Sequence, residues 1–284
     1  MTKLVSILTP SLDQAAYVRD SISSIRNQDY RAIEQVVVDG GSTDGTLDVV
    51  RRYEGDGCRL VVAPGTSQAQ ALNIALAHSA GDIIGWLNTD DAYFGVDAVA
   101  AAVRTFEERP EAVAVYGDGV IADEAGRILR RVSTSAADLA RLQSFSPLVQ
   151  PSVFVRREAL GERFVREDLE VMIDYELWLY LARRGPFAKV GRILAIDRDY
   201  SGRKTRETLP AQARDLETLS DAYGLDPQRP AGRIGRAWFR RANGLTELLT
   251  LETRYTFAFA GRTDARWRRF ARQLLLPQRL LRVV

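Results

Sequence analysis

The sequence predicts an α/β fold in which helices flank a mainly parallel central sheet, followed by an α-helical extension at the C-terminal end. Short apolar runs of strand type alternate with segments of helical periodicity from the start of the chain. Two of these runs, VVV and DIIGWL, are almost wholly apolar, which is typical of strands that helices cover on both faces. The composition, with 46% hydrophobic and 27% charged residues among 284, is that of a globular protein.

The alternation is regular over the first 116 residues. We expect strands at residues 4–10, 33–39, 59–63, 82–87 and 112–116. The helices expected between them cover residues 17–28, 46–53, 68–79 and 96–108. Residues 119–132 are expected to form a hairpin around residues 124–126. Strands separated by helices of this length indicate βαβ units, and hence parallel pairing.

The charge of the chain is unevenly distributed. Residues 227–284 contain thirteen arginines, no lysine and three acidic residues, a balance of +10. Because the whole chain carries +2, residues 1–226 carry about −8 by difference. We therefore expect the two parts to have different surroundings.

Cysteine content and hydropathy indicate in which cellular compartment the protein works. The single cysteine, Cys58, is too little for an internal disulfide or a cysteine metal site, and predicts a reducing environment. The first strand is expected so close to Met1 that no signal peptide fits before it, and no 18 apolar residues run together. We expect a cytoplasmic protein, either soluble or peripheral at the inner face of the membrane.

Polar residues follow three of the predicted strands, as TPS, DGGSTDGT and NTDDA. In an open α/β sheet, ligands bind beyond the carboxyl ends of the strands, so this edge is the predicted binding site. The same residue types also favour turns and helix caps. We expect Asp44 to cap a helix and Asp39, which ends an apolar strand, to bind a ligand.

Two adjacent carboxylates, Asp90 and Asp91, lie at the tip of the fourth predicted strand. Side by side they repel each other and lose hydration, so a positive group should compensate them. Mg²⁺ or Mn²⁺ is the economical choice, because these ions prefer one or two carboxylates together with phosphate oxygens.

A third carboxylate, Asp174, lies on an apolar helical stripe with Leu177, Trp178 and Leu181. Such a group either caps the first turn of its helix or has its proton affinity raised by desolvation. Glu176 points elsewhere, and we expect it to form a salt bridge on the surface.

Five segments follow one another in a characteristic order: VSILTPSLDQAAYVRDSISSIRNQDY, VVVDGGSTDGT, SQAQALNIALAHSAGDIIGWLNTDDAY, QPSVFVRREAL and MIDYELWLYLARRG. Together they resemble the family 2 inverting glycosyltransferases of the GT-A fold, over about residues 3–205. The resemblance implies a catalytic domain over residues 1–205, in which residues 1–118 bind the nucleotide-sugar and residues 119–205 lie on the acceptor side. Residues 206–284 would form an Arg-rich helical extension.

The resemblance assigns roles around the donor. Pro10 and Ser11 would line the nucleotide pocket, and Asp39 would accept a hydrogen bond from the base. That contact suits uracil or thymine and also guanine, so UDP or dTDP is favoured while the base stays open. Asp90 would contact the ribose or the sugar, and Asp91 would bind the Mn²⁺ or Mg²⁺ that bridges the diphosphate.

The resemblance also makes Asp174 the general base that takes a proton from the acceptor hydroxyl, with N-capping as the alternative. In the segment AIDRDYSGRKTRE, Tyr200 stands where the family has a histidine that helps to hold the diphosphate. This departure leaves the diphosphate to Arg198, Arg203 or Lys204, although a basic loop is often simply solvated.

Two further positions resemble donor-side residues of the family. Gln150, ahead of the strand SVFV, would lie near the sugar and acceptor, or would form a turn at the strand edge. Asn73 would face the donor, or would cap neighbouring backbone.

The Arg-rich tail contains two amphipathic patterns. Their apolar residues are Ile234, Ala237, Trp238 and Leu245 in the first, and Trp267, Phe270, Ala271 and Leu274 in the second. Packing against the catalytic domain or a second subunit is the first expectation. Peripheral contact with anionic lipid is the alternative, and the acceptor would then be a lipid-linked glycan. No aromatic stacking platform accompanies the charge, so no nucleic-acid partner is expected.

The sequence thus predicts transfer of a sugar from a nucleoside-diphosphate sugar to an acceptor hydroxyl in polysaccharide, glycolipid or other glycoconjugate synthesis. One alternative is a sugar-phosphate nucleotidyltransferase, although LTPSLDQAAY lacks the Gly-rich, Arg-containing first loop expected there. The other is a nucleotide-sugar-binding scaffold without catalysis.

Overall fold

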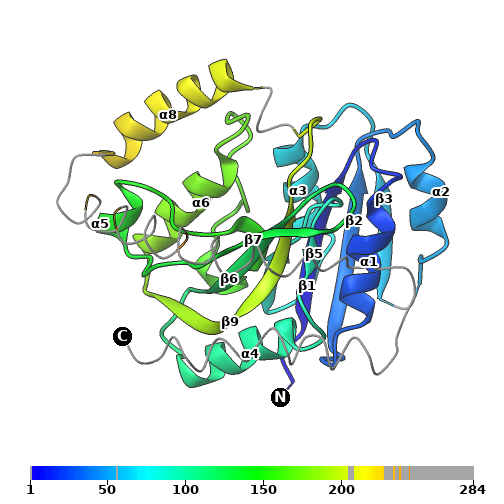
Figure 1. Ribbon diagram of the computed structural model, residues 1–284, viewed down its shortest axis with the longest axis horizontal. Coiled ribbons are helices and arrows are strands. Elements are labelled where there is room, and N and C mark those ends of the chain that lie inside the picture. Colours follow the sequence, from blue (N-terminus) through cyan, green and yellow to red (C-terminus); the bar gives the residue numbers. More distant parts are fainter. Residues whose placement is uncertain are drawn as a thin grey trace.

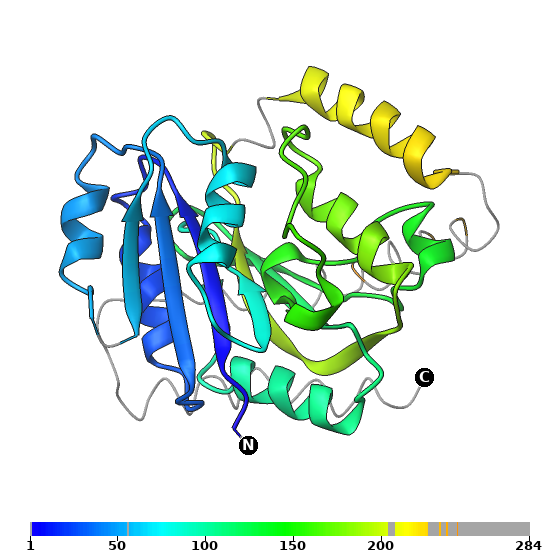
Figure 2. The same cartoon turned by 180° about the vertical axis from the view of Figure 1, so that it is seen from behind.

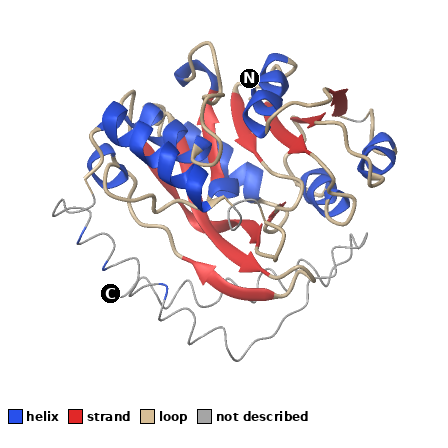
Figure 3. Cartoon of the chain, turned by 90° about the horizontal axis from the view of Figure 1, so that it is seen from above, coloured by secondary structure: helices blue, strands red, loops and turns tan. Residues whose placement is uncertain are grey.

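The computed structural model of the chain describes residues 2–55, 57–203 and 208–226, together with Arg233, Ala237 and Asn243. These residues form one nine-stranded sheet with helices on both of its faces (Figure 1). The sheet curls along its length (Figure 3). The predicted α/β class is confirmed.

Four parallel strands form the first half of the sheet. They are β1 (Val5–Ser11), β2 (Ile33–Asp39), β3 (Cys58–Val62) and β4 (Ile83–Trp86), in the order β3-β2-β1-β4. The reverse view shows the first three side by side (Figure 2). Every residue of β1 and β4 is buried, as expected for strands covered on both faces. The predicted strands agree with these bounds to within one residue.

Five strands complete the sheet: β5 (Ala92–Tyr93), β6 (Ala114–Ala122), β7 (Ile128–Val132), β8 (Val153–Arg156) and β9 (Phe187–Arg198). The order continues from β4 through β8, β6 and β9 to β5, and β7 pairs with β6. Because β8 is antiparallel to both β4 and β6, strands β6 and β9 run in the same direction as β1 to β4. Strands β5 and β7 oppose them. The mainly parallel sheet and the predicted hairpin, which is β6–β7, are both confirmed.

The helices cover the sheet in two layers. They are α1 (Val18–Arg26), α2 (Thr46–Arg51), α3 (Gln68–Ala77), α4 (Ala98–Glu108), α5 (Leu139–Leu142), α6 (Ile173–Ala182) and α8 (Leu209–Tyr223). Leu72 of α3 and Leu177 of α6 share a buried cluster with Trp86 of β4. Phe106 of α4 belongs to a second cluster, with Ile7 of β1. Each such side chain contributes about 1.5–3 kcal/mol by leaving water.

Close packing at β4 explains a glycine in an otherwise bulky strand. A Cβ atom on Gly85 would lie 2.7 Å from the Tyr93 hydroxyl oxygen and 2.9 Å from Cδ1 of Ile7. The glycine therefore lets β4 pass close to β5 and β1. The turn between β4 and β5 carries Asp90 and Asp91, so this packing fixes where the two carboxylates emerge.

Only part of the predicted C-terminal extension falls within the described residues. Helix α8 lies beside α6 (Figure 1), where Leu219 and Tyr223 join the α6 cluster. Asn243 is buried, and its amide oxygen accepts a 2.8 Å hydrogen bond from the Ser133 backbone N–H. Ala237 of the predicted apolar stripe is exposed. The other apolar tail residues named above lie outside the described residues, and no helix in the described part is long and apolar enough to cross a membrane.

Candidate active site at the carboxyl edge of the sheet

The ends of β1 and β2 lie side by side, because Ser11 pairs with Asp39 in the parallel register. Pro10 and Ser11 are buried there. The Ser11 hydroxyl oxygen has no hydrogen-bond partner among the described residues. An unpartnered buried hydroxyl at the end of a strand is a group that a ligand can satisfy.

The Asp39 carboxylate organises the loop that follows β2. It accepts hydrogen bonds from the backbone N–H groups of Gly41 and Ser42, at 3.0 and 2.7 Å, and from the Ser42 hydroxyl at 2.7 Å. Gly41 has φ +100°, a left-handed conformation that glycine adopts at low cost. Asp39 itself is fully buried, so its carboxylate belongs to the wall of this edge.

Asp44, further along the same loop, bonds the start of α2 from the position before its N-cap, Gly45. Its carboxylate accepts the backbone N–H of Thr46, the first residue of α2, at 3.0 Å, and that of Ala15 at 2.8 Å. Burial raises the Asp44 pKa, but the hydrogen bonds lower it by more, so the pKa lies below its ordinary value. The expected bond to the start of a helix is present, although Asp44 is not the N-cap itself.

The two carboxylates after β4 have different environments. Asp91 is only 1% exposed and accepts hydrogen bonds from the Arg198 backbone N–H at 3.1 Å and from the Asn88 side chain at 3.2 Å. Burial, with Asp90 and Asp197 nearby, raises the pKa of Asp91 well above its ordinary value. Asp90 is less buried, and its carboxylate accepts a hydrogen bond from the Tyr200 hydroxyl at 3.1 Å.

One arginine faces this group of acids. Arg203 forms a 2.6 Å ion pair with Asp197, which the sequence reasoning did not single out. Burial lowers the Arg203 pKa, but Asp197, Asp91 and Asp90 outweigh it and leave the pKa raised. Arg203 is therefore the cation that compensates the carboxylates in this structure. Lys204, predicted beside it, lies outside the described residues.

Asp174 lies in the first turn of α6, and its surroundings connect it to the same group. Its carboxylate accepts the backbone N–H of Tyr175 at 2.8 Å. Burial raises its pKa to about 6, with Asp197 contributing in the same direction, while hydrogen bonds and Arg203 oppose the rise. The N-cap of α6 is Met172, so Asp174 does not cap the helix; its carboxylate bonds the next backbone N–H, and its pKa is raised. Asp174 and Asp91 thus share Arg203 and Asp197 as charged neighbours.

Arg198 requires a correction, because its side chain is committed to protein groups. The guanidinium is 2.9 Å from the Asp20 carboxylate and donates at 3.0 Å to the backbone oxygens of Asp90 and Glu124. It also lies over the Tyr17 ring, 4.6 Å from the centroid. We assign it the task of holding the Asp90 turn, and we no longer assign it a diphosphate contact.

Gln150 is the first residue of a short 3-10 helix (Gln150–Ser152). Its side chain supports the turn between β4 and β5, which carries Asp90 and Asp91. Its side chain donates to the Trp86 backbone oxygen at 2.8 Å and accepts from the Asn88 amide at 3.1 Å. Asn88 also donates to Asp91, so Gln150 acts on Asp91 through Asn88. Sequence reasoning missed Asn88, although an amide three residues before a buried carboxylate was a usable signal.

Asn73 also requires a correction, in favour of the backbone-capping alternative. Its amide oxygen accepts the N–H groups of Phe164 and Val165 at 2.9 and 3.0 Å. Its amide nitrogen donates to the Val165 oxygen at 3.0 Å and to the Glu167 carboxylate at 2.8 Å. All its hydrogen-bonding capacity shown here holds the segment before α6, which leaves none for a donor.

Glu176 forms the expected salt bridge, but in the interior and not on the surface. The residue is fully buried, and its two carboxylate oxygens accept 3.1 and 3.2 Å hydrogen bonds from Arg163. The Tyr223 hydroxyl donates a third at 2.6 Å. The expectation failed because α6 is apolar on nearly all sides, so a single stripe did not define its buried face.

A carboxylate of α8, that of Asp215, holds the backbone that leads into α6 just before Asp174. Asp215 is 5% exposed and accepts the backbone N–H groups of Val171 and Met172, at 2.7 and 2.9 Å, and that of Glu170 at 3.1 Å. These are the donors that precede the first turn of α6, which have no partner within that helix. The sequence carried no local signal for this contact, because the partners are more than 40 positions apart.

The donor set at this edge fits a divalent cation. Carboxylate oxygens such as those of Asp91 and Asp90 are ligands that Mg²⁺ and Mn²⁺ prefer. The described residues contain no group of three or more acidic, histidine or cysteine side chains placed to hold a metal by themselves. One or two carboxylates can hold such an ion when phosphate oxygens of a ligand supply the remaining contacts.

Comparison with solved structures defines the class of fold. S. aureus TarS residues 1–349, in complex with UDP-GlcNAc, superimposes with a TM-score of 0.65 at 15% identity, over 97% of this chain and 78% of that one. The mannosyltransferase PcManGT from Pyrobaculum calidifontis, in complex with GDP-Man and Mn²⁺, gives 0.61 at 21% identity, over 99% and 83%. At these identities the likeness establishes the GT-A fold.

Sequence comparison defines the family. Residues 6–164 match the family model described as Glycosyl transferase family 2. This chain therefore belongs to glycosyltransferase family 2.

Relatives of known name support that membership. Chondroitin synthase of Pasteurella multocida (strain Pm70) is 27% identical over 202 residues, which are 67% of this chain and 20% of that protein. The PGL/p-HBAD biosynthesis glycosyltransferase of Mycobacterium bovis (strain BCG / Pasteur 1173P2) is 30% identical over 161 residues, 56% of this chain and 61% of that protein. This chain thus spans less than two thirds of either relative.

Proposed function

We propose that this glycosyltransferase is a metal-dependent inverting enzyme that transfers a sugar from a nucleoside-diphosphate sugar to an acceptor hydroxyl. The observation that carries the proposal is the position of Asp174, whose pKa of about 6 suits a base at neutral pH. It shares Arg203 and Asp197 with the buried carboxylate Asp91, so the base and the acidic turn lie in one electrostatic neighbourhood.

In the proposed reaction, Asp174 accepts the proton of the acceptor hydroxyl as that oxygen attacks the anomeric carbon. The bond from this carbon to the nucleoside diphosphate breaks on the opposite side, so the configuration inverts in one displacement. The charge that develops on the leaving diphosphate requires stabilisation. Arg203, the cation of this edge, is the described residue that we assign to the diphosphate.

We assign the donor to the ends of β1, β2 and β4. Asp39 would accept a hydrogen bond from the base once its loop admits the ligand, Pro10 and Ser11 would line the pocket, and Asp90 would contact the ribose or sugar. Asp91 would bind Mn²⁺ or Mg²⁺, which supplies positive charge to the diphosphate when bound. UDP and dTDP are the favoured donor nucleotides. Glycans, lipid-linked glycans or small molecules are the proposed acceptors, in glycoconjugate synthesis.

An assay of nucleoside-diphosphate release from a panel of sugar donors, with and without Mn²⁺, tests this function. We expect release that depends on Mn²⁺ and on Asp174, and a product whose anomeric configuration, read by proton NMR, is opposite to that of the donor. A scaffold would release nothing from any donor. A nucleotidyltransferase would instead require a sugar phosphate and a nucleoside triphosphate, and a retained configuration would overturn the inverting mechanism.

A further inference from the structure

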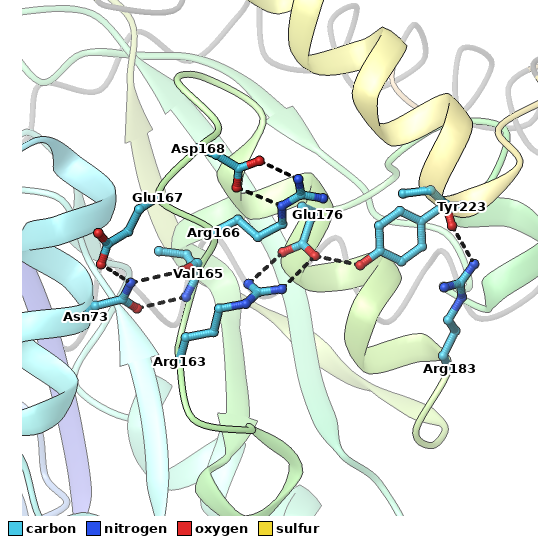
Figure 4. Close-up of a pocket in the computed structure, with 10 residues that line it drawn as sticks. Asn73, Arg163, Val165, Arg166, Glu167, Asp168, Glu176, Arg183 and Tyr223 are labelled. Atoms are coloured by element: carbon cyan, nitrogen blue, oxygen red, sulfur yellow. Dashed lines mark hydrogen bonds and ion pairs between the residues drawn. The ribbon is translucent and has the colours of Figure 1, made fainter.

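A pocket of about 500 Å³ lies on the side of α6 that carries Glu176 (Figure 4). Glu176, which is part of its wall, is two residues beyond Asp174, about 200° further around the helix. The charged neighbours of the two residues differ accordingly: Arg203 and Asp197 for Asp174, and Arg163 for Glu176. The pocket is therefore separate from the carboxyl edge of the sheet.

The walls come from four parts of the chain that are tied to one another: α3, the segment before α6, α6 and α8. The side chain of Asn73, on α3, bonds the backbone of the segment before α6. Asp215 of α8 holds the residues that enter α6. The Tyr223 hydroxyl joins the end of α8 to Glu176. Residues 163–168, which supply half of the lining, form an irregular segment, and these hydrogen bonds tie that segment and α6 to α3 and α8.

Most charges in the pocket are already paired. Glu176 is neutralised by Arg163 and bonded by Tyr223. Arg166 pairs with Asp168, donating from Nε at 2.9 Å. These pairs line the pocket with guanidinium donors and carboxylate acceptors in alternation, without a net charge (Figure 4).

Two charged groups on opposite walls have no ion-pair partner in the described part of the chain. Glu167, on the α3 side, accepts a hydrogen bond from the neutral Asn73 amide. Arg183, on the α8 side, donates to the Ala222 backbone oxygen at 3.1 Å, and its guanidinium lies 4.3 Å from the centroid of the Tyr223 ring. Figure 4 places them at the two ends of the pocket.

The alternation of donors and acceptors selects the chemistry of the ligand. Guanidinium groups only donate and carboxylates only accept, whereas a hydroxyl does both. A polyanion would meet Glu167, Asp168 and Glu176, and a cation would meet three arginines. An apolar ligand would remove these charges from water without replacing their hydrogen bonds. A neutral polyhydroxylated ligand can donate to Glu167 on one wall and accept from Arg183 on the other, and the volume lies within the usual range for small-ligand sites.

We infer that this pocket binds a neutral oligosaccharide segment, away from the site of transfer. One helix diameter, about 10 Å, separates it from the Asp174 face of α6. A glycan chain held here would be a remote part of the acceptor, so the biological use of the pocket rests on the proposed function. Binding of the glycan does not rest on the proposed function, because no pocket residue belongs to the candidate active site around Asp91 and Asp174.

The test measures binding of neutral tetrasaccharides to the whole chain by calorimetry. The probes are maltotetraose, cellotetraose, chitotetraose and mannotetraose, with a heparin tetrasaccharide as the polyanionic comparison. We expect at least one neutral probe to bind and to protect residues 163–168 and the end of α8 from hydrogen exchange. No binding of any neutral probe at millimolar concentration would overturn the inference.

Variants locate the binding. Glu167→Gln and Arg183→Gln should each weaken it by about tenfold, because each removes a charge-assisted hydrogen bond. Arg184→Gln is the matched control for Arg183, since Arg184 is adjacent but lies on Tyr180 and outside the pocket, and binding should be unchanged. Preference for the heparin probe, or equal binding by all variants, would contradict a neutral-glycan pocket.

Asp174→Asn separates the two proposals. This variant should lose transfer while binding the tetrasaccharide as the wild type does. Loss of the neutral probe in Asp174→Asn would place the probe at the acidic edge and overturn the separate pocket. A wild type that binds the probe but transfers no sugar would contradict the proposed function alone.

Discussion

Asp174 and Glu176 lie in the same turn of α6, yet their surroundings differ in kind. Glu176 is fully buried, with a dedicated arginine fork and a tyrosine hydroxyl. Asp174 is partly exposed, has no ion pair with any residue that the structure describes, and shares Arg203 as a charged neighbour with other carboxylates. Carboxylates two residues apart on one helix thus have different surroundings: Glu176 has dedicated partners that hold α6 to α8, and Asp174 is the one that we propose as the base.

The largest expected effect comes from removing the charge of Asp174. Asp174→Asn should lower kcat by about 10²–10⁴-fold, the usual contribution of a general base. Steady-state release of the nucleoside diphosphate measures this. The fold should survive the substitution. A carboxyl whose folded pKa is raised to about 6 costs stability once it is ionised, above that pH, and the neutral amide removes this cost. A variant that is as active as the wild type would contradict the assigned base.

Asp91→Asn tests the other end of the same edge. The amide keeps an acceptor for the Arg198 backbone N–H but loses the charge that would hold a metal ion. We expect activity to fall about 10²-fold or more, and Mn²⁺ to stimulate the residual rate no longer. The measurement is a Mn²⁺ titration of both proteins. Unchanged stimulation by Mn²⁺ would remove Asp91 from the metal site.

On the face of α6 that carries Glu176, Arg163→Gln should reduce the stability of the fold. It leaves the buried Glu176 carboxylate with Tyr223 as its remaining partner, and we expect a loss of about 2 kcal/mol in the free energy of unfolding, less than for a fully buried pair because Arg163 is partly exposed. Urea denaturation measures it. Arg184→Gln is the matched control and should change stability by less than about 0.5 kcal/mol. Equal stability of the two variants would break the contrast with Asp174.

Tyr200→Phe should produce the smallest effect. It removes the hydroxyl that donates to Asp90 at 3.1 Å but keeps the ring contact with Tyr17, 5.1 Å between centroids. The hydroxyl also accepts a 3.4 Å hydrogen bond from the Gln14 side chain, and we expect the KM for the donor to rise about 3–10-fold, with a smaller change in kcat, on losing these positioning contacts. Tyr180→Phe is the control. A change confined to kcat would mean that Tyr200 acts on the reaction step itself.

The sequence predicted the local parts of the fold well. Strands β1 to β4 follow from uninterrupted apolar runs, and the burial of Asp39 follows from its place as the last residue of β2. The place of β8 between β4 and β6 could not be predicted, because antiparallel pairing across about 70 residues leaves no local pattern.

The surroundings of the candidate site residues could be predicted where a local pattern determines them, and not where distant partners do. Asp174 was found from its stripe, and its raised pKa agrees with the expected desolvation. The interior position of Glu176 depends on Tyr223, which is 47 positions away. The backbone role of Asn73 depends on residues more than 90 positions away, and the commitment of Arg198 depends on Asp20. Such side-chain partners arise only from the assembled fold.

The most direct test of the central claim, that Asp174 is the base, is the pH dependence of kcat/KM for nucleoside-diphosphate release. A base acts when deprotonated, so the rate should rise with pH through an apparent pKa near 6 and level off above it. In Asp174→Asn the residual rate should show no such rise between about pH 5 and 8. The same rise in both proteins would contradict the claim, because another group would then be the base.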